Sequence, residues 1–171
     1  MGVWLAPEPG FIIPTGGFIV DFLIVEDDPV MQQIISSMLQ RLGYTVRIAE
    51  DGHAALASCA SQPPAAVLMD VQMPRMDGLT ATRELRRLQR EEGLAHFPII
   101  VASAFYSPTD RAACFEAGAD GFVTKPIMLA KLGAEIYRVV GRSMSGAQPE
   151  GASTLRRWER EDGTTMRDKA A

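Results

Sequence analysis

Short apolar runs alternate with stretches of helical periodicity along the middle of this chain, and the alternation repeats five times. The first apolar run, Phe18–Val25, is hydrophobic at nearly every position, which is typical of a strand buried on both faces. After it, Asp28 and Pro29 form a helix start signal, an N-cap followed by a first helical residue. Apolar residues then recur at helical spacing up to Gly43, which predicts the end of the helix.

The same rhythm continues to residue 140. The other predicted strands are Thr45–Ala49, Ala65–Met69, Pro98–Ala102 and Gly121–Thr124. The other predicted helices are Gly52–Ser61, Leu79–Glu92, Pro108–Ala117 and Met128–Val140. Strand–helix units of this kind predict an α/β fold, a doubly wound parallel sheet of five strands with five helices distributed over both faces.

Composition divides the chain into three zones. Residues 1–17 are rich in Gly and Pro and show no regular period, so we expect a flexible N-terminal arm. Residues 18–140 carry the strand–helix repeat and form the predicted domain. Residues 141–171 open with Ser, Gly and Pro and then become mixed in charge, which favours a disordered C-terminal tail.

Charge and cysteine content narrow the class of protein. The net charge of −4 argues against a nucleic-acid partner, because domains that bind nucleic acid are usually basic. Cys59 and Cys114 lie far apart in predicted helices, so we expect buried thiols in a reducing compartment rather than a disulfide. His53 and His96 lack Cys or His neighbours at ligand spacing, which does not support a zinc site.

Basic residues also gather on the predicted helix Leu79–Glu92, mixed with acidic ones. The basic residues are Arg83, Arg86, Arg87 and Arg90, and the acidic residues among them are Glu84, Glu91 and Glu92. Because both signs of charge are interspersed, we expect a solvated helix face rather than a nucleic-acid contact.

The N-terminal segment lacks the features of a targeting signal. It has no Lys or Arg before residue 17, and Pro7, Pro9 and Pro14 interrupt its apolar stretch, whereas a signal peptide needs a basic start and an unbroken apolar run. No apolar run approaches the ~20 residues that a membrane-spanning helix needs. We therefore expect a cytoplasmic protein.

In parallel sheets of this class, ligands bind outside the carboxyl ends of the strands, so the residues that follow each strand decide the chemistry. The residues at or directly after the ends of the first, third, fourth and fifth strands are Glu26, Asp27, Asp28, Asp70, Ser103, Ala104, Thr124, Lys125 and Pro126. Such a fold would bring acidic groups from two strands to the same edge as one lysine and one hydroxyl.

Crowded carboxylates repel one another unless a cation neutralises them. Mg²⁺ is typically held by one or two carboxylates, water molecules and a phosphate, so we expect Glu26, Asp27 and Asp70 to bind Mg²⁺. Gln72 can offer its main-chain carbonyl to the same ion. Asp28 is better explained as the helix cap before Pro29.

Mg²⁺ and Lys125 together would hold the oxygens of an incoming phosphoryl group. Transfer of that group depends mostly on positioning and charge neutralisation, and a carboxylate such as Asp70 is a competent nucleophile that gives an aspartyl phosphate. The loop after Asp70 has turn-forming residues, which keeps the nucleophile accessible at the strand end.

Four segments, in this order and at the predicted strand ends, resemble the receiver domain of two-component response regulators. They are LIVEDDP at Leu23–Pro29, LMDVQMPRMDG at Leu68–Gly78, PIIVASA at Pro98–Ala104 and GADGFVTKPI at Gly118–Ile127. The resemblance extends from about Phe22 to Val140 and implies the flavodoxin-like strand order 2-1-3-4-5.

The resemblance implies a role for each matching residue of the site. Asp70 would be the phosphoacceptor, and Glu26 and Asp27 would hold Mg²⁺ directly or through water. Lys125 and the main chain of Ala104 would contact the phosphoryl oxygens.

The resemblance also implies a conformational switch beside the site. The hydroxyl of Ser103 would move toward the phosphoryl group, and the switch aromatic Phe122 would turn inward when it does. The peptide bond between Lys125 and Pro126 would be cis, as X-Pro bonds permit. Phe122 lacks the hydroxyl of the tyrosine often found there, so no partner can read its ring through a hydrogen bond. Phe105 is large and apolar, and we hypothesise that it obstructs the water that hydrolyses the aspartyl phosphate.

A receiver domain would act by accepting a signal and passing it on. A histidine kinase or a histidine phosphotransfer protein would donate the phosphoryl group, and the domain would promote its own phosphorylation and dephosphorylation rather than act as an enzyme on a separate substrate. A downstream partner would bind the face made by the fourth helix, fifth strand and fifth helix, with no direct nucleic-acid or membrane contact. That face carries Tyr106, Ala112, Phe115, Val123 and Lys131.

The surroundings of the domain fit a relay component. The segment after Asp70 is most similar to receivers attached to hybrid histidine kinases or fed by phosphotransfer proteins. Only about 30 residues follow Val140, fewer than the ~50 of the smallest domains, so we expect a single-domain relay or a receiver excised from a longer protein.

Three alternatives share parts of this pattern. A Mg²⁺-dependent phosphatase with an aspartyl phosphate intermediate carries a second Asp two residues after the nucleophile, where this chain has Gln72. A flavodoxin-type FMN-binding protein has a Ser/Thr/Gly-rich phosphate loop after the first strand, where three acids here would repel phosphate. The alternative that stays open is a receiver-fold interaction module that signals without phosphorylation.

Overall fold

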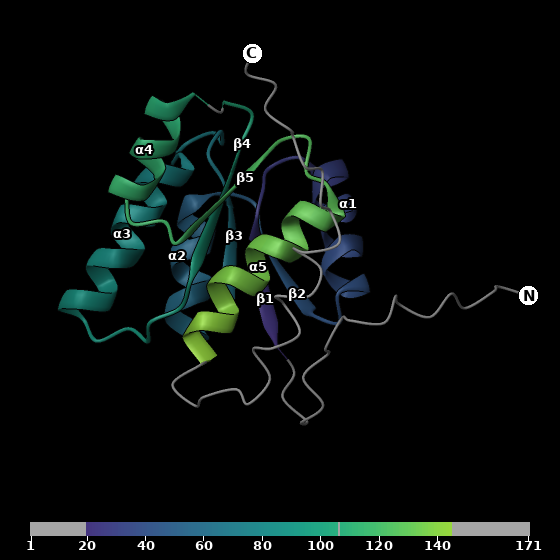
Figure 1. The fold of residues 1–171 in the computed structure, drawn as a ribbon. Helices are drawn as coiled ribbons and strands as arrows, with labels where there is room; N and C mark the ends of the chain where they lie inside the picture. The colour runs from purple at the N-terminus through teal and green to yellow at the C-terminus, as the bar shows by residue number, and fades with distance from the viewer. Residues whose placement is uncertain (1–19, 106, 145–171) are drawn as a thin grey trace, which may run out of the picture.

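The structure is a computed structural model that describes residues 20–105 and 107–144, and a parallel sheet forms its centre (Figure 1). The strands are β1 (Asp21–Val25), β2 (Thr45–Ala49), β3 (Ala66–Asp70), β4 (Ile99–Ser103) and β5 (Gly121–Thr124). They pair in the order β2-β1-β3-β4-β5, and all four neighbouring pairs are parallel. This order confirms the predicted doubly wound α/β fold.

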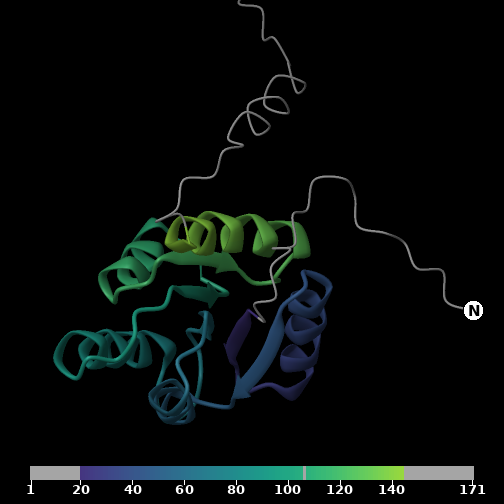
Figure 2. The same cartoon turned by 90° about the horizontal axis from the view of Figure 1, so that it is seen from below.

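Five helices connect the strands and cover both faces of the sheet. They are α1 (Pro29–Arg41), α2 (Gly52–Ser61), α3 (Gly78–Glu91), α4 (Pro108–Glu116) and α5 (Leu129–Met144). Buried residues of α1 and α5 share one hydrophobic cluster with the sheet, and those of α2, α3 and α4 share the other. Figure 2, seen along the strands from below, shows the two groups of helices on either side of the sheet.

The apolar strand runs are explained by burial on both faces. On β1, Phe22 and Ile24 enter the cluster under α1 and α5, whereas Leu23 and Val25 enter the cluster under α2, α3 and α4. All five residues of β3 and of β4 are buried. On β1, β3 and β4, polar side chains therefore have room only at the strand ends, where the candidate chemistry lies.

The first helix begins where the sequence predicts. The side chain of Asp28 accepts hydrogen bonds from the main-chain N–H groups of Val30 (2.7 Å) and Met31 (3.4 Å), and Pro29 is the first helical residue. Gly43 follows the helix with φ of 86°, a conformation that glycine adopts without steric cost. The assignment of Asp28 as a cap is confirmed.

Some predicted boundaries differ from those observed. β3 and β4 each end later than predicted, because Asp70 pairs in register with Ala102, and Ser103 with Thr124. α5 extends past Val140 to Met144, so its last turn includes residues assigned to the tail. Apolar side chains that bury against the sheet earlier in α5 stabilise the helix enough to continue through glycine, which costs about 1 kcal/mol relative to alanine. The predicted arm and most of the predicted tail lie outside the described residues.

The expectation of a uniformly solvated basic face on α3 is wrong for one residue. Arg86 is buried, and its guanidinium donates hydrogen bonds to the carbonyls of Phe97 (2.9 Å) and Gly118 (2.9 Å) and pairs with Asp120. Arg86 follows Leu85 on the packed side of the helix, so its stem is buried and its head reaches carbonyls beyond the helix.

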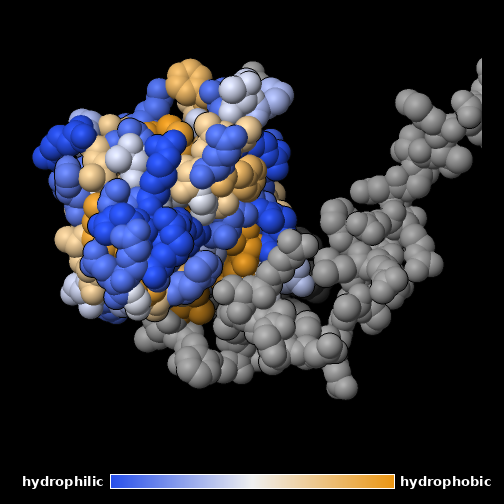
Figure 3. Space-filling model, turned by 90° about the vertical axis from the view of Figure 1, so that its left-hand side faces the viewer, coloured by the Kyte–Doolittle hydropathy of each residue, from blue (hydrophilic) through white to orange (hydrophobic). Residues whose placement is uncertain are grey.

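The rest of that basic face agrees with the sequence expectation. Arg87 forms exposed ion pairs with Glu84, Glu91 and Glu92 at 2.9 to 3.2 Å. Figure 3 shows the side of the molecule that bears α3 and α4, and its surface is largely hydrophilic with smaller apolar areas. Within residues 20–105 and 107–144, no helix combines the length and apolar character needed to span a bilayer.

Candidate functional site

Acidic side chains from two adjacent strands meet at the carboxyl edge of the sheet. Glu26 and Asp27 follow β1, Asp70 ends β3, and one carboxylate oxygen from each lies within 4.8 Å of the others. Lys125, directly after β5, places its Nζ 2.8 Å from Glu26 Oε2 and 3.0 Å from Asp70 Oδ2. The fold thus brings together the acids and the lysine that the sequence predicts at this edge.

The three acids differ in their exposure. Glu26 and Asp70 are only 2% and 4% exposed, whereas Asp27 is open to solvent. A hydrogen bond also holds the backbone at Glu26: Gln32 Nε2 donates to the Glu26 main-chain carbonyl at 2.8 Å. The cluster therefore has a rigid, buried base and one side accessible to an ion or a small molecule.

The charges of the cluster shift one another's protonation. Burial raises the pKa of the Glu26 carboxyl and repulsion from Asp70 adds to it, while the hydrogen bond from Lys125 acts in the opposite direction. Burial alone would lower the pKa of Lys125, but its hydrogen bonds to Glu26 and Asp70 outweigh this and raise it. The lysine is thus held as an ammonium ion facing two carboxylates.

The main chain fixes the orientation of Asp70. The N–H of Gln72 donates to Asp70 Oδ1 at 3.1 Å, so one carboxylate oxygen is tied to the loop while the other faces Lys125. Gly78 begins α3 directly against the Asp70 main chain: a Cβ at Gly78 would lie 1.9 Å from the Asp70 carbonyl oxygen. Only glycine permits this approach of the loop to the strand end.

The donor set at this edge fits a hard divalent cation. All the side-chain donors are carboxylate oxygens, which Mg²⁺ prefers, and they are close enough together to share one ion. Two of them are buried with a single lysine as counter-charge, so a further cation would relieve their remaining repulsion. The role of the Gln72 carbonyl as a further ligand stays a prediction.

The predicted switch residues lie on the two strands that follow β3 in the sheet, Ser103 at the end of β4 and Phe122 within β5. Ser103 is buried, and its Oγ accepts a hydrogen bond from the main-chain N–H of Phe105 at 3.0 Å. Phe122 is half-buried on β5, with the Arg111 guanidinium 5.8 Å from its ring centroid. The Lys125–Pro126 peptide is cis, which confirms that prediction.

The predicted downstream face needs one correction. Val123 is only 5% exposed and belongs to the cluster under α1 and α5, because alternate residues of β5 face opposite sides of the sheet. Ala112, Phe115 and Lys131 are exposed as expected. Tyr106 lies outside the described residues.

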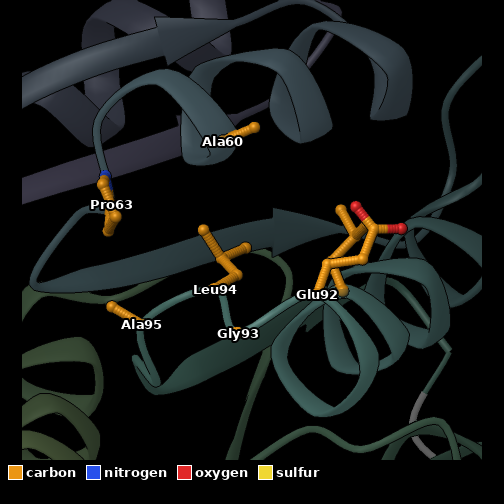
Figure 4. A pocket seen from close by; sticks show the side chains of 7 residues that line it. Ala60, Pro63, Glu92, Gly93, Leu94 and Ala95 are labelled. Atoms are coloured by element: carbon orange, nitrogen blue, oxygen red, sulfur yellow. The ribbon is translucent and has the colours of Figure 1, made fainter.

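A shallow groove at the other end of the sheet is not part of this site. It has a volume of about 400 Å³ and lies between the C-terminal ends of α2 and α3 (Figure 4). The lining residues are Ala60, Pro63, Leu88, Glu92, Gly93, Leu94 and Ala95. With Glu92 as its single ionisable residue, this groove offers no chemistry comparable to the acidic cluster.

Sequence reasoning missed two contacts near the site. The guanidinium of Arg75 pairs with the carboxylate of Asp51, and Arg111 lies over the rings of both Phe115 and Phe122. The Arg75 pair and the Arg111–Phe122 contact each join residues from different elements. No local period or motif predicts such contacts.

Comparison with known proteins agrees with this geometry. The family model of the response regulator receiver domain matches residues 22–137. Response regulator MprA of Mycolicibacterium vanbaalenii is 37% identical over 138 residues, which cover 80% of this chain and 58% of that protein. Sensor histidine kinase GacS of Pseudomonas protegens is 32% identical over 131 residues, which cover 77% of this chain and 14% of that protein.

A solved structure adds a bound ion to the comparison. The receiver domain of sensor histidine kinase PA1611 from Pseudomonas aeruginosa, crystallised with a magnesium ion coordinated in its active-site cleft, is 38% identical. The match has a TM-score of 0.63 and covers 71% of this chain and 97% of that one. The chain spans little more than half the length of the MprA relatives. Its fold, its strand-end residues and these matches show that it belongs to the receiver domain family of two-component response regulators.

Proposed function

We propose that this domain accepts a phosphoryl group on Asp70 from the phosphohistidine of a histidine kinase or a histidine phosphotransfer protein. The observation that carries the proposal is the placement of Asp70, which lies at the end of β3 with Lys125 Nζ 3.0 Å from its carboxylate. Glu26 and Asp27 complete an oxygen-rich cluster beside it. A nucleophile, a fixed positive charge and a metal-binding set thus face one another.

The acids would bind Mg²⁺ as part of this reaction. Glu26, Asp27 and Asp70 would supply carboxylate oxygens, and Gln72 would add its main-chain carbonyl. When bound, the ion neutralises negative charge on the phosphoryl oxygens. The similarity to a receiver domain with coordinated magnesium supports this assignment.

The transfer is a substitution at phosphorus. A carboxylate oxygen of Asp70 forms the new P–O bond, the P–N bond of the phosphohistidine breaks, and the released imidazole takes up a proton. The Lys125 ammonium and the Ala104 main-chain N–H would bind phosphoryl oxygens as charge develops on them. Later attack by water would release inorganic phosphate and restore Asp70, so the domain is its own substrate rather than an enzyme for another.

The signal would leave the site through the switch residues. The Ser103 hydroxyl, now bound by the Phe105 N–H, would turn toward the phosphoryl group, and Phe122 would follow inward. The change would be read on the α4–β5–α5 face, where Phe115 is exposed, without direct contact to nucleic acid or membrane. The two cysteines are buried free thiols, which favours a cytoplasmic location.

The test is the intact mass of the protein after incubation with acetyl phosphate. A phosphoryl adduct should form on the wild-type chain with Mg²⁺, and it should be absent without Mg²⁺ and in Asp70→Asn. If neither acetyl phosphate nor a panel of phosphorylated kinases and phosphotransfer proteins gives an adduct, the phosphorylation-independent interaction module becomes the better reading.

The lifetime of the adduct should depend on Phe105. This side chain is 54% exposed, and the main-chain N–H of Phe105 donates to the Ser103 hydroxyl, which places the residue directly beside a predicted site residue. Replacing it by asparagine should admit water and speed hydrolysis about fivefold, equivalent to ~1 kcal/mol of barrier. Decay of the adduct after removal of donor measures this rate, with Phe105→Leu as the apolar control. Hydrolysis at the parental rate in Phe105→Asn would contradict the shielding role.

A further inference from the structure

The loop between β3 and α3, residues 71–77, is anchored at both of its ends. At the start, the N–H of Val71 donates to the Ala102 carbonyl at 3.0 Å, and the N–H of Gln72 donates to Asp70. At the far end, the N–H of Gly78 donates to the Val71 carbonyl at 3.0 Å. These contacts close the loop but do not attach its middle to the rest of the domain.

A third anchor holds the middle of the loop. The Arg75 guanidinium pairs with the carboxylate of Asp51, the residue that caps α2. The Asp51 side chain is only 9% exposed and also accepts a hydrogen bond from the Ala54 N–H at 2.8 Å. The bond to α2 fixes the Asp51 side chain independently of Arg75, so Asp51 is a rigid attachment point for the loop.

The backbone at this anchor is unusual for arginine. Arg75 has φ of 67°, and it is the one non-glycine residue with positive φ in the part of the chain that the structure describes. Glycine would adopt this conformation at lower cost, so the arginine side chain compensates for an unfavourable backbone. The next residue, Met76, packs against α2 so closely that a Cβ on Gly52 would lie 2.7 Å from its Sδ.

We propose that Arg75 is a positioning residue for the magnesium and phosphoryl site. By pairing with Asp51 it fixes the loop against the start of α2 and so holds the Gln72 main chain in place beside Asp70. This rests on the proposed function, in which the Gln72 carbonyl binds the ion. An ion binds more tightly when its ligand groups are already ordered in the free protein, because less conformational entropy is lost on binding.

The proposed role differs from a contribution to overall stability. Arg75 is 65% exposed, and exposed ion pairs contribute little to folding. Replacing it by glycine also relieves the unfavourable φ, so the melting temperature of Arg75→Gly should stay close to that of the parent. The effect of the substitution should instead be local: faster hydrogen exchange at the Gln72 amide and a lower affinity for Mg²⁺.

The experiment uses the full chain and three variants at residue 75. Arg75→Gln keeps most of the length without the charge, Arg75→Gly removes the side chain and the φ cost, and Arg75→Lys keeps the charge. Two readouts are compared without any phosphoryl donor: the Mg²⁺ dissociation constant by calorimetry, and the hydrogen exchange rate of the Gln72 amide in metal-free protein.

We expect the Gln and Gly variants to weaken Mg²⁺ binding about fivefold and to speed Gln72 exchange by a similar factor, as the loss of one weak ion pair allows. Arg75→Lys should keep most of the Mg²⁺ affinity and most of the protection of the Gln72 amide. Asp51→Asn, which retains a capping side chain, should match Arg75→Gln, and the double variant should lose no more than either single one. Fully additive losses in the double variant would overturn the proposal.

The outcomes separate this proposal from the proposed function. Parental Gln72 exchange in both Arg75→Gln and Arg75→Gly would overturn the positioning role, even if Asp70 is phosphorylated normally. Conversely, if the wild-type chain takes up no phosphoryl group but the variants still speed Gln72 exchange, the proposed function fails while the loop anchor stands.

Discussion

Replacing Lys125 by methionine is expected to slow phosphoryl transfer to Asp70 about 100-fold, the usual effect of removing one fixed electrostatic contact to a transition state. Methionine has a similar length but no charge. The wild-type Nζ lies 3.0 Å from Asp70 Oδ2 and 2.8 Å from Glu26 Oε2. Its raised pKa keeps it charged, so the phosphoryl oxygens meet a full positive charge that water cannot replace.

The same substitution should leave the affinity for Mg²⁺ unchanged or increase it. Without the ammonium ion, Glu26 and Asp70 keep their mutual repulsion but lose their only side-chain counter-charge among the described contacts. The ion should therefore bind as tightly as in the parent, or more tightly. A slower transfer with undiminished Mg²⁺ affinity would assign the loss to the lysine itself and not to a missing metal.

The measurement is the rate of adduct formation with acetyl phosphate at saturating Mg²⁺, together with the Mg²⁺ dissociation constant. Lys131→Met is the matched control, because Lys131 is an exposed lysine on α5. Its rate should equal that of the parent. A Lys125→Met rate within twofold of the parent would show that Lys125 serves the fold and not the transfer.

The strand ends could be predicted because two independent signals coincide there. The buried strands β3 and β4 are continuous apolar runs, and the residue at which each run stops is polar, so the pattern alone places Asp70 and Ser103. Their mutual geometry is a different matter. Lys125 and Glu26 are 99 residues apart, and the sequence predicted that they share an edge of the sheet but not that they form an ion pair.

The sequence predictions were wrong or incomplete where the answer depends on packing between elements and not on the residues of one element. Val123 and Phe122 are both apolar residues of the short strand β5, and only the sheet shows that Val123 faces the core under α5. The extent of α5 depends on the apolar side chains up to Val140 that bury against the sheet, rather than on the glycine that follows. Contacts between elements, such as Arg75 with Asp51, leave no periodic trace in the sequence.

The contacts of Arg86 also join different elements, so the sequence does not indicate them. Its burial leads to a prediction about stability. Beyond its bonds to the Phe97 and Gly118 carbonyls, the guanidinium pairs with Asp120, whose carboxylate also accepts the Ile99 N–H at 2.8 Å. One side chain thus joins α3 to the start of β4 and to the turn before β5. An arginine among other arginines on a strongly charged helix gives no sequence sign of this role.

Arg86→Leu should lower the free energy of unfolding by about 3 kcal/mol, toward the lower end for a broken buried pair because the Asp120 side chain remains 35% exposed. The leucine fills the space of the stem but leaves the Asp120 carboxylate without its positive partner and two carbonyls without their donor. Urea unfolding at neutral pH measures the change. Arg83→Leu, on the exposed side of the same helix, should alter stability by no more than about 0.5 kcal/mol. Equal losses in the two variants would mean that Arg86 contributes only helix propensity and surface charge, and that the network around Asp120 does not stabilise the fold.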